Sequence, residues 1–149
     1  MVDSAQSLIQ EILTKFIPHF FPDAKVLLVG DAGDKNVIED DGALLALGIE
    51  LEARGKAPDV VIHDLKRDWL IVIEAVTSHG PIDQKRRNEI SDLFSSASPG
   101  IVYVTAFSDC ASYVKFARSI AWETEVWLAD APEHLIHYSG TRFLGPYES

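Results

Sequence analysis

The sequence predicts a single α/β domain of 149 residues, in which helices cover both faces of a mixed central β-sheet. Short runs rich in Val and Ile, of strand length, alternate along the chain with segments whose apolar residues recur at helical spacing. Two of the strand-length runs lie only a few residues apart, which predicts a hairpin within the sheet. The hydrophobic fraction of 47% and the charged fraction of 24% are typical of a globular protein with one core.

The first third of the chain predicts two helices and one strand. Apolar residues at helical spacing favour a helix over residues 4–17, and Pro18 is expected to end it. Residues 25–29 form a short β-rich run suited to a strand. A second, short helix is expected over about residues 40–47, with an aspartate as its cap and Gly48 as its stop.

The predicted hairpin lies in the middle of the chain, where residues 59–65 and 69–76 are joined by the tight connection 66–68. Each of its strands carries a carboxylate that a core strand should not have. Asp59 stands at the head of the first strand and Glu74 near the end of the second. A buried, unpaired charge costs several kcal/mol, so Glu74 is expected to be paired, to lie at a sheet edge, or to hold a metal ion.

The C-terminal half predicts two more helices and three more strands. The helices are expected over residues 83–94 and 109–120, and the strands over residues 101–104, 126–129 and 134–138. The run Ile-Val-Tyr-Val at 101–104 is fully apolar, which is typical of a central strand that is buried on both faces.

Composition excludes several classes of protein. No apolar run approaches the roughly 20 residues that span a bilayer, and the first residues lack the basic start of a signal peptide. The single cysteine, Cys110, rules out an internal disulfide. These features predict a cytoplasmic protein with no membrane partner.

The net charge of −10 argues against a protein that binds nucleic acid by electrostatic attraction alone. The densest basic cluster is Lys85-Arg86-Arg87, which follows the strand that carries Glu74. If a polyanion binds to this protein, that cluster is the face on which we expect it. Charge patterning taken alone favours the alternative, a solvated helix face.

The hairpin carboxylates predict a metal site. If the hairpin pairs in register, Asp59 lies opposite residues near the end of the second strand, so that Asp59 and Glu74 converge at one end of the sheet. Two hard oxygen ligands with an open coordination sphere suit Mg²⁺, which keeps several waters and shares a substrate phosphate. Without metal, the two like charges should repel, so that removing the charge of Glu74 should not destabilise the protein.

Pro58-Asp59 and Glu74-Ala75-Val76 resemble the PD-(D/E)XK nuclease core. The blocks "GDAGDKNVIEDDGALLALGI", "WLIVIEAVTSHGPIDQKR" and "IAWETEVWLADAPEHLIHYSGTRFLGPY" resemble the catalytic domain of the BsuBI/PstI type II restriction endonucleases, over about residues 26–147. The resemblance implies a PD-(D/E)XK restriction-endonuclease-like fold, Mg²⁺ dependence and double-stranded DNA as substrate. It also implies a homodimer, since two-fold symmetry matches the two strands of a palindrome.

The resemblance also assigns roles to single residues. Asp59 and Glu74 would hold the metal ion, with the backbone carbonyl of Ala75 as a third ligand. The family core has a lysine two residues after the acid, where this chain has Val76. We expect Lys85, at the start of the next helix, to supply the missing cation and orient the attacking water.

Both basic candidates have structural alternatives. Lys85 could pair with Glu89, four residues later on the same helix. His79, in the loop after the Glu74 strand, could act as a catalytic base or contact a phosphate, or it could instead cap the following helix.

The whole chain, residues 1–149, is expected to form one catalytic domain. Enzymes of the family also carry an N-terminal helical region that is thought to help read the site, and we expect this region to be absent here or to sit on another polypeptide. A separate specificity subunit or methyltransferase is therefore a candidate partner. The alternative class is a non-catalytic remnant or a partner-binding module of a restriction system. The departure at Val76 favours that alternative, whereas the retained carboxylates of Asp59 and Glu74 argue against it.

Overall fold

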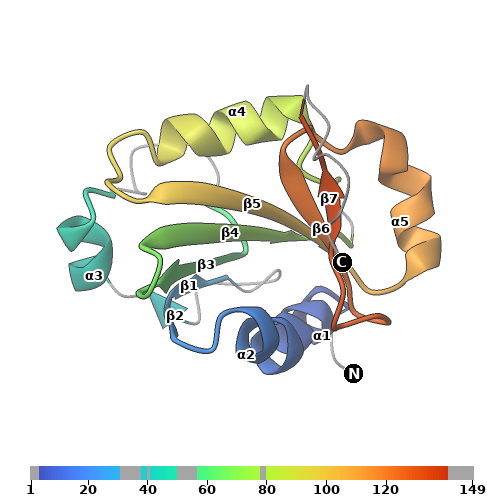
Figure 1. Ribbon diagram of the computed structural model, residues 1–149, viewed down its shortest axis with the longest axis horizontal. Coiled ribbons are helices and arrows are strands. Elements are labelled where there is room, and N and C mark those ends of the chain that lie inside the picture. Colours follow the sequence, from blue (N-terminus) through green and yellow to red (C-terminus); the bar gives the residue numbers. More distant parts are fainter. Residues whose placement is uncertain (1–3, 31–37, 40, 50–56, 78–79, 141–149) are drawn as a thin grey trace, which may run out of the picture.

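The computed structural model describes residues 4–30, 38–39, 41–49, 57–77 and 80–140. At its centre is a seven-stranded sheet in the order β2-β1-β3-β4-β5-β6-β7 (Figure 1). β5 pairs parallel with β4 and β6, and every other neighbouring pair is antiparallel. The strands are β1 (Ala24–Val29), β2 (Ile38–Glu39), β3 (Val60–Asp64), β4 (Trp69–Ala75), β5 (Gly100–Phe107), β6 (Thr124–Leu128) and β7 (Ile136–Tyr138). The predicted mixed α/β sheet is confirmed.

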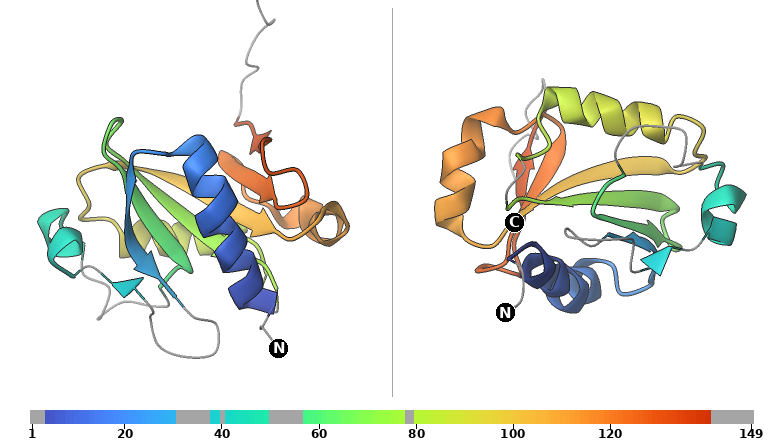
Figure 2. Two further views of the ribbon diagram at one scale, coloured as in Figure 1. Left: turned by 90° about the horizontal axis from the view of Figure 1, so that it is seen from below. Right: turned by 180° about the vertical axis from the view of Figure 1, so that it is seen from behind.

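Helices cover both faces of this sheet (Figures 1 and 2). The N-terminal helical segment lies against one face, and α4 (Gln84–Leu93) lies against the other. α3 (Asp41–Ala46) and α5 (Cys110–Phe116) add apolar side chains on the α4 side. None of the helices in the described part of the chain is long and apolar enough to cross a bilayer.

The N-terminal helical segment continues past the residue expected to end it. It consists of α1 (Ser4–Glu11), a π-helical turn (Ile12–Phe16) and α2 (Ile17–Phe20), so the expected end at residue 17 is three residues short. In the wider π turn, the backbone N–H of Ile17 donates to the carbonyl of Ile12, five residues back. Pro18 follows in the first turn of α2, where a missing N–H is tolerated. The proline therefore lies within the helical segment.

The predicted hairpin is present and pairs in register. Val60 lies opposite Ile73, and Asp64 lies opposite Trp69. Side chains on the two strands alternate between two apolar clusters. The cluster on the N-terminal helix side includes Val60, Ile62, Ile71 and Ile73, and the cluster on the α4 side includes Val61, Leu70 and Val72. This alternation fixes the face to which each neighbouring side chain points.

α4 begins at a defined cap. The side chain of Asp83 accepts a hydrogen bond of 2.8 Å from the backbone N–H of Arg86, which satisfies one of the free donors of the first turn. Ile90 and Leu93 are buried against the sheet and hold the rest of the helix in place. The cap and the apolar stripe together determine which side chains of the first turn face the hairpin.

Candidate active site

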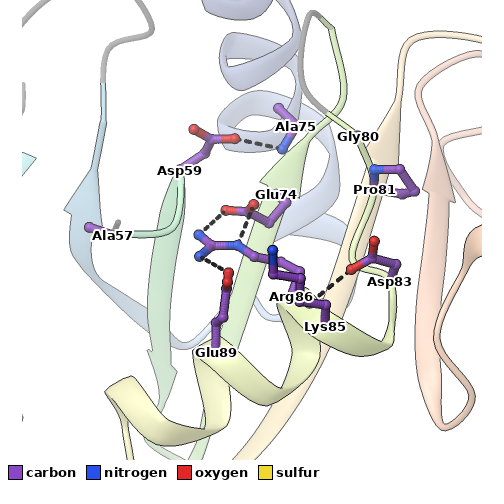
Figure 3. Close-up of a pocket in the computed structure, with 10 residues that line it drawn as sticks. All are labelled: Ala57, Asp59, Glu74, Ala75, Gly80, Pro81, Asp83, Lys85, Arg86 and Glu89. Atoms are coloured by element: carbon purple, nitrogen blue, oxygen red, sulfur yellow. Dashed lines mark hydrogen bonds and ion pairs between the residues drawn. The ribbon is translucent and has the colours of Figure 1, made fainter. Parts of the chain in front are cut away.

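The two hairpin carboxylates lie on the same face of the sheet. Since Val60 is opposite Ile73, the next opposed positions are Asp59 and Glu74. Both follow the alternation of Val61, which faces α4. They line one pocket of about 290 Å³ between the hairpin end and the start of α4 (Figure 3). The structure therefore brings together the two acids that the sequence singled out.

Asp59 is held in place by the strand beside it. Its Oδ2 accepts a hydrogen bond of 2.8 Å from the backbone N–H of Ala75, across the open end of the hairpin. The backbone carbonyl of Asp59 accepts a bond of 2.7 Å from Gly30. The N–H of Ala75 thus orients the carboxylate of Asp59 through a charge-assisted hydrogen bond.

Glu74 is paired with an arginine from the opposite helix. Nε of Arg86 donates to Oε2 of Glu74 at 2.9 Å, and Nη2 donates to Oε1 at 3.1 Å (Figure 3). Both side chains are only 14% exposed. A bidentate, charge-assisted pair of this kind offsets the desolvation of a carboxylate on a core strand. Glu74 is therefore paired, which is one of the three outcomes expected for it, and the charge of Arg86 offsets the repulsion expected from Asp59.

Arg86 also touches a second acid. Its Nη1 lies 3.4 Å from Oε1 of Glu89, a longer contact to a half-exposed side chain. Burial by itself would lower the pKa of Arg86, but the hydrogen bonds and charges of Glu74 and Glu89 outweigh it and raise the pKa above its ordinary value. The guanidinium is a permanent cation between two carboxylates.

Lys85 lies on the solvent side of the same pocket (Figure 3). Its side chain is exposed, and within the described part of the chain it has no recorded hydrogen bond or ion pair. The alternative expected for Lys85, a pair with Glu89, does not form, because Glu89 contacts Arg86 instead.

Val76 does not open into the pocket. Its side chain is 4% exposed and packs with Phe107, Ile120 and Val126 in a third apolar cluster, while its N–H donates to the carbonyl of Ala106. The position at which the PD-(D/E)XK pattern carries a lysine is thus part of the core in this chain. A cation for the pocket has to come from another element, and α4 presents two.

The remaining candidates are placed as follows. Ala75 is among the residues that line the pocket, and its role as a carbonyl ligand stays a prediction. His79 lies outside the described residues. Sequence reasoning had placed Arg86 in a basic patch and did not identify it as the partner of Glu74. The spacing of Arg86 and Glu89, three residues apart on one helix face, could have indicated their mutual contact but not the contact with Glu74.

The chemistry of the pocket suits a divalent cation. No three His, Cys, Asp or Glu side chains cluster as a complete ligand set in the part of the chain that is described. Two carboxylates and a backbone carbonyl would leave places for waters and for a phosphate oxygen, which is how Mg²⁺ is usually bound. Among the described residues, four acidic and two basic side chains line the pocket and carry a net charge of −2, namely Asp59, Glu74, Asp83 and Glu89 against Lys85 and Arg86.

The fold and this acidic hairpin pocket define the class as PD-(D/E)XK restriction-endonuclease-like. The structure of SdaI restriction endonuclease matches with a TM-score of 0.88 and 40% sequence identity, over 97% of this chain and 46% of that chain. The chain belongs to the BsuBI/PstI restriction endonuclease domain family, whose model matches residues 3–141. The family resemblance seen in the sequence is confirmed.

Two curated relatives are similar along most of this chain. It is 48% identical over 141 residues to the type II restriction enzyme BsuBI of Bacillus subtilis, which covers 95% of this chain and 45% of the relative. It is 29% identical over 144 residues to the type II restriction enzyme AplI of Arthrospira platensis, covering 92% and 44%. The chain thus spans less than half the length of these relatives.

Proposed function

We propose that this chain carries the catalytic centre of a Mg²⁺-dependent endonuclease that hydrolyses phosphodiester bonds of double-stranded DNA. One observation carries the proposal. Asp59 and Glu74 occupy opposed positions at the open end of a hairpin and line one pocket, into which α4 brings Lys85 and Arg86. Membership of a family of restriction endonuclease domains supports the same activity.

The ligands of the ion in this proposal are the carboxylates of Asp59 and Glu74 and the backbone carbonyl of Ala75. When bound, Mg²⁺ would stabilise negative charge on the scissile phosphate and favour deprotonation of the attacking water. The hydrogen bond from the Ala75 N–H holds the Asp59 carboxylate in orientation during binding. A pre-oriented ligand loses less entropy when the ion arrives.

Lys85 acts on the attacking water in this proposal. Its ammonium reaches the pocket from the start of α4 and is not engaged by any recorded ion pair in the described part of the chain. Placed beside the water, it would orient the nucleophile and stabilise the negative charge that develops on the phosphate. Lys85 thereby takes the role of the lysine that the PD-(D/E)XK pattern has at the position of Val76. His79 is proposed as a further contact to the substrate phosphate or as a base.

The proposal extends to partners. A homodimer would place two such pockets on the two strands of a palindromic site. Sequence recognition and a protecting methyltransferase are proposed to come from other polypeptide segments or chains, since the net charge of −10 gives this domain little general attraction for DNA. The single cysteine and the DNA substrate favour a place in the cytoplasm.

A plasmid assay tests the proposed activity. Supercoiled DNA is incubated with the chain in Mg²⁺ or in EDTA, beside the variant Glu74→Gln. Nicked or linear product in Mg²⁺ alone, and none with the variant, is the expected result. Intact DNA under all conditions, together with specific capture of another protein of the restriction system, would instead identify a non-catalytic binding module.

A further inference from the structure

Arg86 occupies both carboxylate oxygens that the proposed metal site needs from Glu74. Its Nε and Nη2 donate to Oε2 and Oε1 at 2.9 and 3.1 Å. Both partners are largely shielded from water, so the contact is not a loose surface pair. The guanidinium fork thus contacts both oxygens through which Glu74 could bind a cation.

The two cations oppose each other at Glu74 in this arrangement. A Mg²⁺ ligand must approach to about 2.0–2.1 Å, and the fork already places N–H groups on both oxygens. A divalent ion beside a guanidinium in a partly buried pocket also adds repulsion between like charges. Binding of the ion to Glu74 therefore favours release of at least part of the fork.

A second acceptor for Arg86 is already in position. Glu89 is one turn further along α4, and its Oε1 touches Nη1 of the same guanidinium at 3.4 Å. At 51% exposure, Glu89 has room to move toward the arginine. The backbone of Arg86 is meanwhile held by the Asp83 cap, so that a change of partner needs only side-chain rotation.

We infer that Arg86 and the divalent ion compete for Glu74, and that Glu89 accepts the arginine when the ion binds. Arg86 is thus a positioning residue that neutralises Glu74 in the metal-free protein and sets the threshold for metal binding. The inference rests on the proposed function, because it takes the metal site to lie at Asp59 and Glu74.

The test is the affinity for Mn²⁺, measured by titration calorimetry and by electron paramagnetic resonance of free Mn²⁺. Arg86→Lys keeps the charge but loses the bidentate fork. It should bind Mn²⁺ about tenfold more tightly than the parent chain, as expected when a charge-assisted contact no longer opposes the ion. Arg86→Gln should bind at least as tightly as Arg86→Lys.

Arg87 provides the matched controls. It is the next residue of α4, and its guanidinium stacks on Tyr103 instead of holding a carboxylate. Arg87→Lys should leave the Mn²⁺ affinity unchanged. Arg87→Gln measures how much the affinity changes when one positive charge on this helix is lost and its long-range repulsion of the ion disappears. Unchanged or weaker Mn²⁺ binding in Arg86→Lys would overturn the inference, because the fork would then be neutral toward the ion or would help to bind it.

Glu89→Gln tests the second half of the exchange. It should weaken Mn²⁺ binding in the parent chain, because the carboxylate of Glu89 that accepts the released guanidinium is then lost. In the Arg86→Gln background the same substitution should have a smaller effect, and equal effects in both backgrounds would contradict the role of Glu89 as acceptor.

Asp59→Asn separates this inference from the proposed function. If Mn²⁺ binding to the parent chain does not depend on Asp59, the proposed metal site itself fails, and the inference fails with it. If binding depends on Asp59 but not on the Arg86 fork, only the inference fails.

Discussion

The two ends of one hairpin each carry a shielded carboxylate paired with an arginine, but the pairs differ in origin. At the turn, the side chain of Asp64 on β3 is 3% exposed and accepts a hydrogen bond of 2.8 Å from Nη1 of Arg67. It also accepts a hydrogen bond of 3.2 Å from the backbone N–H of Lys66. Arg67 is 47% exposed and lies over the rings of Phe21 and Trp69. Within the described part of the chain, the hydrogen-bond donors to the Asp64 carboxylate come from its own turn.

At the open end, the partner comes from elsewhere in the chain. Glu74 is bound by Arg86, twelve residues later and on a helix across the pocket. A second acid, Asp59, lies opposite, and a second acceptor, Glu89, lies beside the arginine. Among the residues that the structure describes, no second acid or second acceptor of this kind accompanies Asp64.

The difference shows what separates a structural ion pair from a candidate site. The contacts of Asp64 are all explained by the formation of a tight turn. The contacts of Glu74 bring two acids and two cations to one pocket, an arrangement that hairpin formation does not require. The comparison predicts that the two ends respond differently to the same type of substitution.

The largest expected effect is the loss of cleavage in Asp59→Asn. Removing a metal ligand should reduce Mg²⁺-dependent plasmid cleavage by at least about 10²–10³-fold. Asp64→Asn, at the other end of the same strand, should cleave at close to the parent rate at a temperature where both variants are folded. Equal losses in the two variants would show that the assay reports stability and not chemistry.

A second contrast concerns lysines at the two ends. Lys85→Ala should slow the chemical step by about 10²-fold, because a cation beside the attacking water is lost. Lys66→Ala, an exposed lysine of the turn, should have no effect. Single-turnover rates at saturating Mg²⁺ make the comparison. Parent-like cleavage by Lys85→Ala would leave Arg86 or His79 as the source of the cation.

Val76→Lys should destabilise the protein, although it restores the lysine of the general PD-(D/E)XK pattern. The new ammonium would be buried among Phe107, Ile120 and Val126, at a cost of about 3 kcal/mol in the free energy of unfolding. Val114→Lys, at a 63% exposed position on α5, is the control and should change stability by less than about 0.5 kcal/mol. Urea denaturation measures both. A Val76→Lys variant as stable as the parent chain would contradict this, because the new ammonium would then have to reach the pocket instead of being buried.

The smallest effect separates the two ion pairs by stability. Glu74→Gln should lower the free energy of unfolding by about 1–2 kcal/mol, because a shielded bidentate pair is lost. Asp64→Asn should lower it by less, because Arg67 is half exposed and an asparagine oxygen can still accept the turn N–H. Thermal and urea melts in EDTA check this order. A Glu74→Gln variant more stable than the parent chain would show that repulsion between Asp59 and Glu74 outweighs the ion pair with Arg86.

Much of the site followed from sequence because it depends on strand alternation. Apolar residues on either side of a three-residue connection predicted the hairpin, and its register places Asp59 opposite Glu74. Lys85 was expected to reach that end, and it lines the pocket there together with Arg86. Which of its members contacts Glu74 was not predictable, since one residue is a rotation of about 100° around a helix. That rotation is set by the Asp83 cap and by burial of Ile90, which are tertiary facts.

Other differences also arise from packing. Pro18 was expected to end a helix. It lies instead in the first turn of α2, directly after a π turn, where a missing N–H is tolerated. The two-residue strand β2 is too short for any periodicity to reveal. The sequence shows that Val76 stands where the pattern has a lysine. That this position belongs to the core is visible only from its packing in the third apolar cluster. These features depend on neighbours distant in sequence.

The most direct test is a crystal structure of the chain soaked in Mn²⁺, with anomalous diffraction recorded at the manganese edge. The central claim is that Asp59 and Glu74 together hold one divalent ion. It predicts a single strong anomalous peak between these two carboxylates, with the guanidinium of Arg86 moved away from Glu74 toward Glu89. A peak elsewhere, or none while Arg86 stays bound to both oxygens of Glu74, would contradict it.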